Sequence, residues 1–261
     1  MIDIHCHILP GIDDGPETID EALEMCRMTY ADGVKIIVAT PHFNPGVYEP
    51  ASAKIMQLID ELETRAKEKG INIKILPGAD VAVTPELPVH FKKEEYLTIN
   101  RTGRYFLAEF PPASVPPKWD AFLLSLLSSG MVPVITHPER NPWFIEHPEA
   151  LYSVVSKGVM VQITAMSITG GFGDEAQEYS IFLLQNNLAH VIATDAHSAA
   201  WRPPLLSEAV KFAADVIGEE RAKALVTTIP ASIIEGKSIL LPEPVQPRRK
   251  KKGWLQKVFL H

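Results

Sequence analysis

Residues 1–40, MIDIHCHILPGIDDGPETIDEALEMCRMTYADGVKIIVAT, contain the strand, helix and strand that decide the fold. Ile2 to His5 is a short run with β-branched residues that predicts a strand, and Val34 to Thr40 predicts a second one. Between them, Thr18 and Glu21 have the spacing of a capping box, which predicts the start of an amphipathic helix. Elements in this order form parallel strands joined by a crossover helix.

The same alternation continues along the chain. Apolar residues with helical spacing from Ile55 to Ala66 predict a second helix, which Gly70 ends. Further helices are expected near Trp119–Ser129, Pro148–Lys157 and Asp174–Asn187. The other predicted strands are Ile71–Pro77, Tyr105–Phe110, Met131–Thr136, Val159–Thr164 and His190–Thr194. Seven such strands favour an α/β fold, a distorted TIM-like (β/α)7 barrel, and the segment Thr84–Thr98 is expected to leave the barrel.

The composition indicates one large folded domain followed by a basic tail. The chain has 261 residues, of which 46% are hydrophobic, enough for a full core. We expect the domain to span residues 1–241 and a flexible tail to span residues 242–261. The tail carries six basic residues and one acidic residue, whereas the whole chain has a net charge of -7. The acidic body argues against binding nucleic acid over a broad surface.

Two patterns bear on location. The amino terminus, Met-Ile-Asp-Ile-His, lacks the basic and then apolar order of a secretory signal, and no run approaches the roughly 18 apolar residues of a membrane span. We therefore expect a cytoplasmic protein. In the tail, Arg248–Lys252 precede Trp254, Leu255, Val258 and Phe259, which suits peripheral contact with anionic lipid at the inner face of the membrane. A solvated, disordered tail is an equally good interpretation.

The two cysteines, Cys6 and Cys26, give no support to thiol chemistry. They lack the CxxC spacing of a redox pair or a thiolate metal site, and are expected to be small buried hydrophobes. A cysteine phosphatase needs an arginine six residues after its nucleophile, but Ile12 and Asp32 occupy these positions.

Residue types that bind metal ions lie at the predicted C-terminal ends of nearly every strand. In a βα barrel the loops after the strands build one active site, so these residues are expected to converge. The candidates are His5, His7, Asp13, Asp14, His42, Asp80, Glu109, His137, Glu139, Asp195 and His197. Burying so many imidazoles and carboxylates together costs free energy that metal ions offset, which favours a multinuclear metal site over a hydrogen-bonded polar core.

The spacing of the candidates indicates the kind of site. His5 and His7 are two residues apart at a strand end, so both imidazoles point the same way while Cys6 points to the other side. Mixed imidazole and carboxylate ligands without thiolate suit Mn, Fe or Zn better than Ca, and their number implies two or three ions. Neighbouring ions of this kind activate water and stabilise an in-line displacement at phosphorus, so hydrolysis of a phosphoester is the predicted reaction.

Arg140 and Arg202 each follow one of these strand ends. Guanidinium groups bind phosphate oxygens through two parallel hydrogen bonds, so both residues are candidate clamps for a phosphate group. The alternative for each is an ion pair at the protein surface.

Five motifs together resemble a known family: MIDIHCHILPGIDDG at 1–15, VATPHFNPGVY at 38–48, LAEFPP at 107–112, VITHPER at 134–140 and ATDAH at 193–197. They are similar to the PHP (polymerase and histidinol phosphatase) superfamily, and most of all to its bacterial tyrosine-protein phosphatase branch of the CpsB/CapC type. That branch is associated with capsule and exopolysaccharide synthesis. The resemblance implies a PHP fold over roughly residues 1–240.

The resemblance also implies three metal positions, with Mn the favoured ion and Fe or Zn as alternatives. The first position would be held by His5, His7, Asp80 and Asp195, the second by Asp80, Glu109 and His137, and the third by Asp14, His42 and His197. The expected catalytic set is Arg140, Arg202, His42 and Asp195. Asp80 stands where such sequences usually have Glu, one methylene longer, so metal spacing is expected to differ.

The implied function is hydrolysis of phosphotyrosine on a protein, expected to be a membrane-associated bacterial tyrosine kinase that controls exopolysaccharide or capsule synthesis. Two alternatives stay open: a small-molecule phosphatase of the histidinol-phosphatase type, and a metal-binding regulatory protein without turnover. Relative catalytic efficiency on phosphotyrosine and histidinol phosphate separates the first, and metal binding without hydrolysis of any phosphoester would indicate the second.

Overall fold

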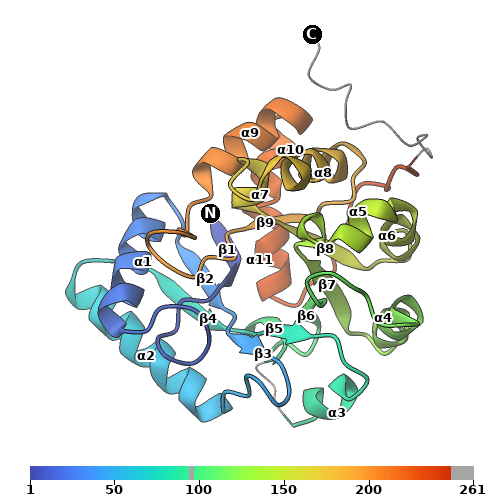
Figure 1. Ribbon diagram of the computed structural model, residues 1–261. Coiled ribbons are helices and arrows are strands. Elements are labelled where there is room, and N and C mark those ends of the chain that lie inside the picture. The colour runs from blue at the N-terminus through green and yellow to red at the C-terminus, as the bar shows by residue number, and fades with distance from the viewer. Residues whose placement is uncertain (94–96, 248–261) are drawn as a thin grey trace.

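A computed structural model describes residues 1–93 and 97–247 of the chain (Figure 1). The basic residues Arg248–Lys252 and the apolar residues after them lie outside the described residues, so lipid contact by the tail stays a prediction. Before them, Val245 N donates to Asn186 O at 2.8 Å, which attaches this segment to the end of α8 (Asp174–Gln185). Within the described ranges, no helix combines the length and the apolar character needed to cross a bilayer.

Parallel strands form the centre of the molecule, and every ladder between them is parallel. The described part of the chain contains β1 (Ile2–Cys6), β2 (Ile36–Ala39), β3 (His42–Phe43), β4 (Lys74–Pro77), β5 (Asp80–Ala82), β6 (Tyr105–Glu109), β7 (Val132–Thr136), β8 (Met160–Thr164) and β9 (Val191–Ala193). β2 runs on into β3 after two residues, and β4 runs on into β5 in the same way. The strands therefore occupy the predicted seven positions.

Both interruptions have a local cause. Pro41 lacks the backbone N–H that a strand donates to its neighbour. On the adjacent strand, a Cβ atom at Gly78 would lie 2.6 Å from the side chain of Val38, so only glycine permits this close approach. Pairing resumes where Asp80 N donates to Pro41 O at 3.1 Å. The two interruptions lie immediately before His42 and Asp80, two of the candidate ligands.

The strands form a ring. Their order is β1-β2-β4 in one ladder and β3-β5-β6-β7-β8-β9 in the other, and the shared chain segments join the two. The segment after β9 meets β1 at an isolated parallel bridge between Cys6 and Ala196. There Asp195 N donates to His5 O at 2.8 Å, and His7 N donates to Ala196 O at 2.9 Å. The prediction of a distorted α/β barrel is confirmed.

Helices cover the outside of the ring (Figure 1). The helices that the alternation predicts are confirmed as α1 (Ile19–Ala31), α2 (Ser52–Glu68), α4 (Trp119–Ser128), α6 (Pro148–Val155) and α8. α1 begins at the predicted capping box, in which Glu21 N donates to Thr18 Oγ1 and Thr18 N donates to Glu21 Oε2, both at 3.3 Å. The excursion over 84–98 holds α3 (Leu87–Phe91), outside the ring, where Phe91 packs edge-to-face on Phe106 with centroids 4.8 Å apart.

Several elements differ from the sequence prediction. The alternation does not include α5 (Pro142–Glu146), α7 (Ala165–Ile168), α9 (Ser207–Ile217), α10 (Glu219–Ala224) or α11 (Thr228–Ile234), nor the short 3-10 turns η2 (Ile99–Arg101) and η3 (Pro138–Arg140). The third predicted strand begins at Lys74 rather than Ile71. Ile71 N donates to Ala66 O at 2.9 Å and so completes the end of α2, which takes this residue out of the sheet.

Two apolar cores divide the buried side chains. The larger lies between the strands and the surrounding helices. The smaller contains Ile4, Val38, Ile99, Tyr105, Leu107, Val134, Met160, Val191, Ala193, Ile233 and Ile234, from alternate strand positions and α11. It fills the interior of the ring at the end where the strands begin, and α11 covers it. The opposite end of the interior is left to polar side chains.

Candidate metal centre

The nine residues that the resemblance implies as metal ligands lie at the carboxyl ends of the strands. They are His5 in β1, His7 and Asp14 after it, His42 in β3, Asp80 in β5, Glu109 at the end of β6, His137 after β7, and Asp195 and His197 after β9. His5, His7, Asp80, Asp195 and His197 are at most 1% exposed. The loops thus build one site from distant parts of the sequence.

Ligand atoms gather in three overlapping groups, and within each group they lie within 4.8 Å of one another. The groups are His5, His7 and Asp80; His42, Asp80 and Glu109; and His7, Asp14, His42 and His197. The remaining two residues lie beside the first group: His137 Nε2 is 3.9 Å from Asp80 Oδ2, and Asp195 Oδ1 is 3.4 Å from His5 Nε2. The structure therefore brings all nine side chains together, and their assignment as ligands stays a prediction.

Two of these groups correspond closely to the implied metal positions. Asp14 Oδ1 lies 3.4 Å from His42 Nε2 and 3.3 Å from His197 Nε2, as the third implied position requires. His5 Nε2 lies 3.2 Å from His7 Nε2 and 3.4 Å from Asp80 Oδ2, as the first requires. Asp80 belongs to two groups, so its shorter side chain still reaches the place where a bridging carboxylate is expected.

The remaining group differs in one member. His42 Nδ1 lies 3.2 Å from Glu109 Oε2 and 3.8 Å from Asp80 Oδ2, so His42 occupies the place that the resemblance implies for His137. His137 remains adjacent, with its ring centroid 5.9 Å from that of His5. His42 thus faces Asp14 through one ring nitrogen and Glu109 through the other.

Two further residues orient the first histidines. His5 Nδ1 lies 2.9 Å from the carbonyl oxygen Oε1 of Gln162, and His7 Nδ1 lies 2.7 Å from Asp13 Oδ2. Because both partners accept, each Nδ1 carries a proton, so Nε2 is the nitrogen through which each ring would bind a metal ion. Sequence reasoning assigned no role to Gln162, although a polar residue inside an otherwise apolar buried strand is a signal for it.

The electrostatics of the cluster fit divalent cations. Asp80 Oδ2 is buried and accepts no hydrogen bond from the described residues. Burial disfavours the Asp80 carboxylate, but the charge of His5 and the nearby ring nitrogens of His137 and His5 hold its pKa well below the ordinary range. Burial also disfavours the charged form of His7, yet its hydrogen bond with Asp13 and the Asp13 charge raise its pKa to about 10. Buried carboxylates are stabilised by positive charge beside them. Divalent cations would supply this charge and would displace protons from the imidazoles as they bind.

Arg140 and Arg202 both reach this site. Their Nη2 atoms lie 2.6 and 2.5 Å from Asp195 Oδ2, and Arg202 Nη2 also donates to Asp195 O at 2.7 Å. Burial opposes ionisation of Asp195, but the charges of Arg140 and His5 hold the pKa of its carboxyl well below the ordinary range. Both guanidinium groups also lie near the ring of Phe172, at 4.7 and 5.7 Å from its centroid. The arginines therefore converge on one carboxylate of the cluster instead of forming separate surface ion pairs.

Glu139 has a structural place in the same turn. Its Oε1 accepts from Thr164 N and Ser167 Oγ, both at 2.8 Å, so it holds η3 against β8 and α7 and does not enter the cluster. The backbone is strained at two places in the site. His137, at the start of this turn, has a φ of 35°, and Asp195, in the loop after β9, has a φ of 49°. Non-glycine residues in this region cost free energy and occur where the surroundings impose them, often at functional sites.

Comparison with known proteins identifies the family. The sequence model described as capsular polysaccharide synthesis, CpsB/CapC, matches residues 1–235. The chain belongs to the CpsB/CapC family. Among its CpsB/CapC relatives, the tyrosine-protein phosphatase YwqE of Bacillus subtilis is 36% identical over 97% of this chain and 98% of its own length. The tyrosine-protein phosphatase CpsB of Streptococcus agalactiae is 31% identical over 90% of this chain and 98% of its own.

A solved structure extends the CpsB/CapC relationship to three dimensions. It comes from work on YwqE of Bacillus subtilis and CpsB of Streptococcus pneumoniae, described there as metal-dependent tyrosine phosphatases, and it matches with a TM-score of 0.90, 35% identity, and coverage of 95% of this chain and 100% of that one. A histidinol phosphate phosphatase of Lactococcus lactis matches with a TM-score of 0.54 and 16% identity over 85% of this chain and 94% of its own, which shows a shared fold alone. The predicted family is confirmed.

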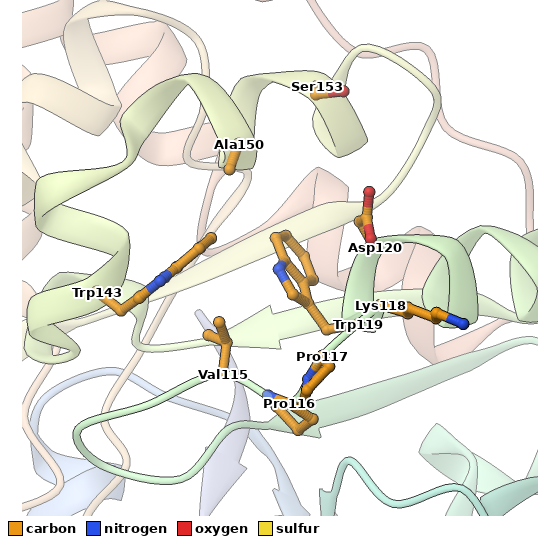
Figure 2. A pocket seen from close by; sticks show the side chains of 9 residues that line it. All are labelled: Val115, Pro116, Pro117, Lys118, Trp119, Asp120, Trp143, Ala150 and Ser153. Atoms are coloured by element: carbon orange, nitrogen blue, oxygen red, sulfur yellow. The ribbon is translucent and has the colours of Figure 1, made fainter.

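A separate cavity of about 470 Å³ lies between the segment after β6 and helices α5 and α6 (Figure 2). Trp119 and Trp143 face it from two sides, with Pro116 and Pro117 along its edge. Lys118 and Asp120 are its charged residues, and its lining contains neither histidine nor a pair of carboxylates. It therefore lacks the ligand types of the metal centre.

Proposed function

We propose that this chain is a metal-dependent phosphatase that removes phosphate from tyrosine residues of proteins. The observation that carries the proposal is the convergence of nine imidazole and carboxylate side chains with two arginines at one end of the barrel. Membership of a family whose relatives are tyrosine-protein phosphatases supports it. Cysteine chemistry has no part in the proposal, since Cys6 is buried against the outer core and burial raises its pKa well above the ordinary range.

We propose three metal positions, which the three groups of ligand atoms support. We assign His5, His7, Asp80 and Asp195 to the first, Asp80 and Glu109 with His137 or His42 to the second, and Asp14, His42 and His197 to the third. Nitrogen and oxygen donors without thiolate favour Mn, with Fe or Zn as alternatives. When bound there, divalent ions would lower the pKa of water and neutralise charge that develops on a transferred phosphoryl group.

The chain's own groups would bind and orient the substrate. Arg140 and Arg202 both reach Asp195 in the cluster, and the guanidinium N–H groups not used on Asp195 would donate to equatorial oxygens of the phosphate. Asp195 holds both guanidinium groups in place before substrate arrives. The phenol of tyrosine has a pKa of about 10, so it departs with less help from a proton donor than an aliphatic alkoxide needs.

The proposed substrate is a phosphorylated tyrosine kinase at the inner face of the cytoplasmic membrane, in a pathway of capsule or exopolysaccharide synthesis. The naming of the family after capsular polysaccharide synthesis supports this choice, as does the run of basic and apolar residues that begins at Arg248. Binding to vesicles with and without anionic lipid, compared between the full chain and a chain truncated at Pro242, tests the membrane contact. Equal binding by the two chains would remove it.

The decisive experiment measures hydrolysis of a phosphotyrosine peptide before chelation, after chelation, and after Mn is restored. We expect activity to disappear and return, and the variant His5→Ala to stay inactive at every step. Full activity after exhaustive metal removal would reject the proposal. Histidinol phosphate serves as the rival substrate: a higher kcat/KM on it would favour the small-molecule phosphatase. Metal binding without turnover of any phosphoester would favour the regulatory protein.

A further inference from the structure

Two aromatic side chains border the cluster, each beside a different histidine. The ring of Tyr48 stacks on His42, with centroids 5.8 Å apart and an interplanar angle of 20°. The ring of Trp201 lies beside His197, with centroids 6.1 Å apart. His42 and His197 themselves are 6.0 Å apart and share Asp14 between them. The two rings therefore flank the same group of candidate ligands.

The backbone holds both rings in place. Tyr48 follows β3 in a tight turn closed by two hydrogen bonds, from Asn44 N to Tyr48 O at 2.8 Å and from Tyr48 N to Asn44 O at 2.9 Å. Trp201 lies in the turn formed by residues 197–202, after β9. There Trp201 N donates to Ser198 Oγ at 3.0 Å, and His197 N donates to Arg202 O at 3.1 Å. Trp201 thus sits in a short loop between His197 and Arg202, and Tyr48 in a turn that begins two residues after His42.

Both rings keep part of their surface open to solvent. Trp201 is 61% exposed, and Tyr48 is half-buried beside Val47, which is 67% exposed. Phe172 differs, because both Arg140 and Arg202 lie near its ring, whereas Trp201 has only one guanidinium group, that of Arg202, beside it among the described residues. Large apolar side chains left open beside a charged, buried centre suit a ligand with one apolar part and one anionic part.

We propose that Trp201 and Tyr48 bind the phenyl ring of an aryl phosphate and so determine a preference for phosphotyrosine over aliphatic phosphoesters. The inference rests on the proposed function, because it places the phosphate at Arg140 and Arg202 and the ring outside them. Trp201 directly precedes Arg202, whose guanidinium carbon lies 5.8 Å from its ring centroid, so the ring and the phosphate contact come from adjacent residues. Neither aromatic residue takes part in the chemical step.

The test compares Trp201→Ala, Trp201→Phe and Tyr48→Ala with the unmodified chain, all loaded with Mn. Leu240→Ala is the matched control, since Leu240 is fully exposed and apolar but belongs to the segment after α11. We expect Trp201→Ala to lower kcat/KM for a phosphotyrosine peptide about tenfold, mainly through KM, and to change kcat/KM for phosphoserine less than about twofold. Trp201→Phe should recover most of the loss, and Leu240→Ala should behave like the unmodified chain.

A binding measurement decides the inference without turnover. Calorimetry with phenylphosphonate and with methylphosphonate gives the preference for an aryl group as a ratio of dissociation constants. We expect the ratio to fall about tenfold in Trp201→Ala and to fall also in Tyr48→Ala. An unchanged ratio, or equal losses on both peptide substrates, would overturn the role of these rings while leaving the proposed function intact. An unmodified chain that hydrolyses neither peptide would overturn the proposed function, and the phosphonate ratio would still judge the rings.

Discussion

The two ends of the barrel interior are built from the same strands and filled in opposite ways. Where the strands begin, Val134, Leu107 and Val191 pack under α11 in an apolar core. Where they end, Asp80 and His5 are equally buried, and Asp80 Oδ2 accepts no hydrogen bond within the described residues. The apolar side chains at the first end are stabilised by packing alone, whereas the buried carboxylates at the second end need cations beside them. Stability and chemistry are thus separated along the strand axis, as in other βα barrels.

The alternation of side chains explains how one strand serves both ends. Leu107 lies in the apolar interior, and Glu109, two residues further along β6, enters the cluster. Residues two apart on a strand point to the same side, so only the position along the axis separates a core residue from a candidate ligand.

The largest expected effect comes from removing the charge shared by two groups of the cluster. Asp80→Asn should lower kcat/KM for a phosphotyrosine peptide by about 10³-fold, because metal ions contribute several kcal/mol to transition-state stabilisation. Asp120→Asn, at an exposed position on α4, is the control. Activity within tenfold of the original chain would contradict the separation of the two ends.

The opposite change affects the apolar end. Leu107→Ala should lower the free energy of unfolding by about 2–5 kcal/mol, because it leaves a cavity in a fully buried core. The folded fraction should keep its kcat/KM within about twofold. Urea unfolding followed by circular dichroism, with activity measured at a temperature where the variant is folded, checks both parts. A loss of activity without loss of stability would mean that the ends are coupled.

A smaller effect is expected at the border of the cluster. Arg140→Lys and Arg202→Lys should each lower kcat/KM about 10- to 100-fold, because a lysine keeps the charge but cannot donate as a planar fork. Metal content, measured by elemental analysis of the purified variants, should not change. Loss of metal in either variant would show that the arginines support the cluster through Asp195 and do not act mainly on phosphate.

The smallest effect concerns a residue that only orients a candidate ligand. Gln162→Leu should weaken Mn binding about tenfold, because His5 loses the partner that sets its ring and its proton. Competition with a chromogenic chelator measures the affinity. Gln177→Leu is the matched control, since the Gln177 side chain donates to Ile168 O at 2.9 Å on the outside of the barrel. Equal affinities in the two variants would remove this role from Gln162.

Local patterns predicted much of the fold because their causes are local. The capping box at Thr18 forms as expected, and the strands that carry the candidate ligands all exist. α9 was predictable too, since its apolar residues have helical spacing and Gly218 follows it. The predicted alternation does not include it, because that alternation ends with the last strand. The boundary between α2 and β4 was not predictable to the residue. Ile71 donates its N–H to the end of α2, and this contact between neighbouring segments keeps it out of the strand.

The sequence by itself determined which residue types stand at the ends of the strands, because alternation and β-branched runs mark a strand without knowledge of its neighbours. Only the tertiary structure decided the pairing within the cluster. A register shift in β1 between Asp3 and Cys6 places Ile4 in the inner core and Cys6 in the outer one, so that His5 and His7 both face the cluster. Which ring meets which carboxylate, and the convergence of Arg140 and Arg202 on Asp195, depend on contacts between segments far apart in the chain, and no local pattern encodes such distances.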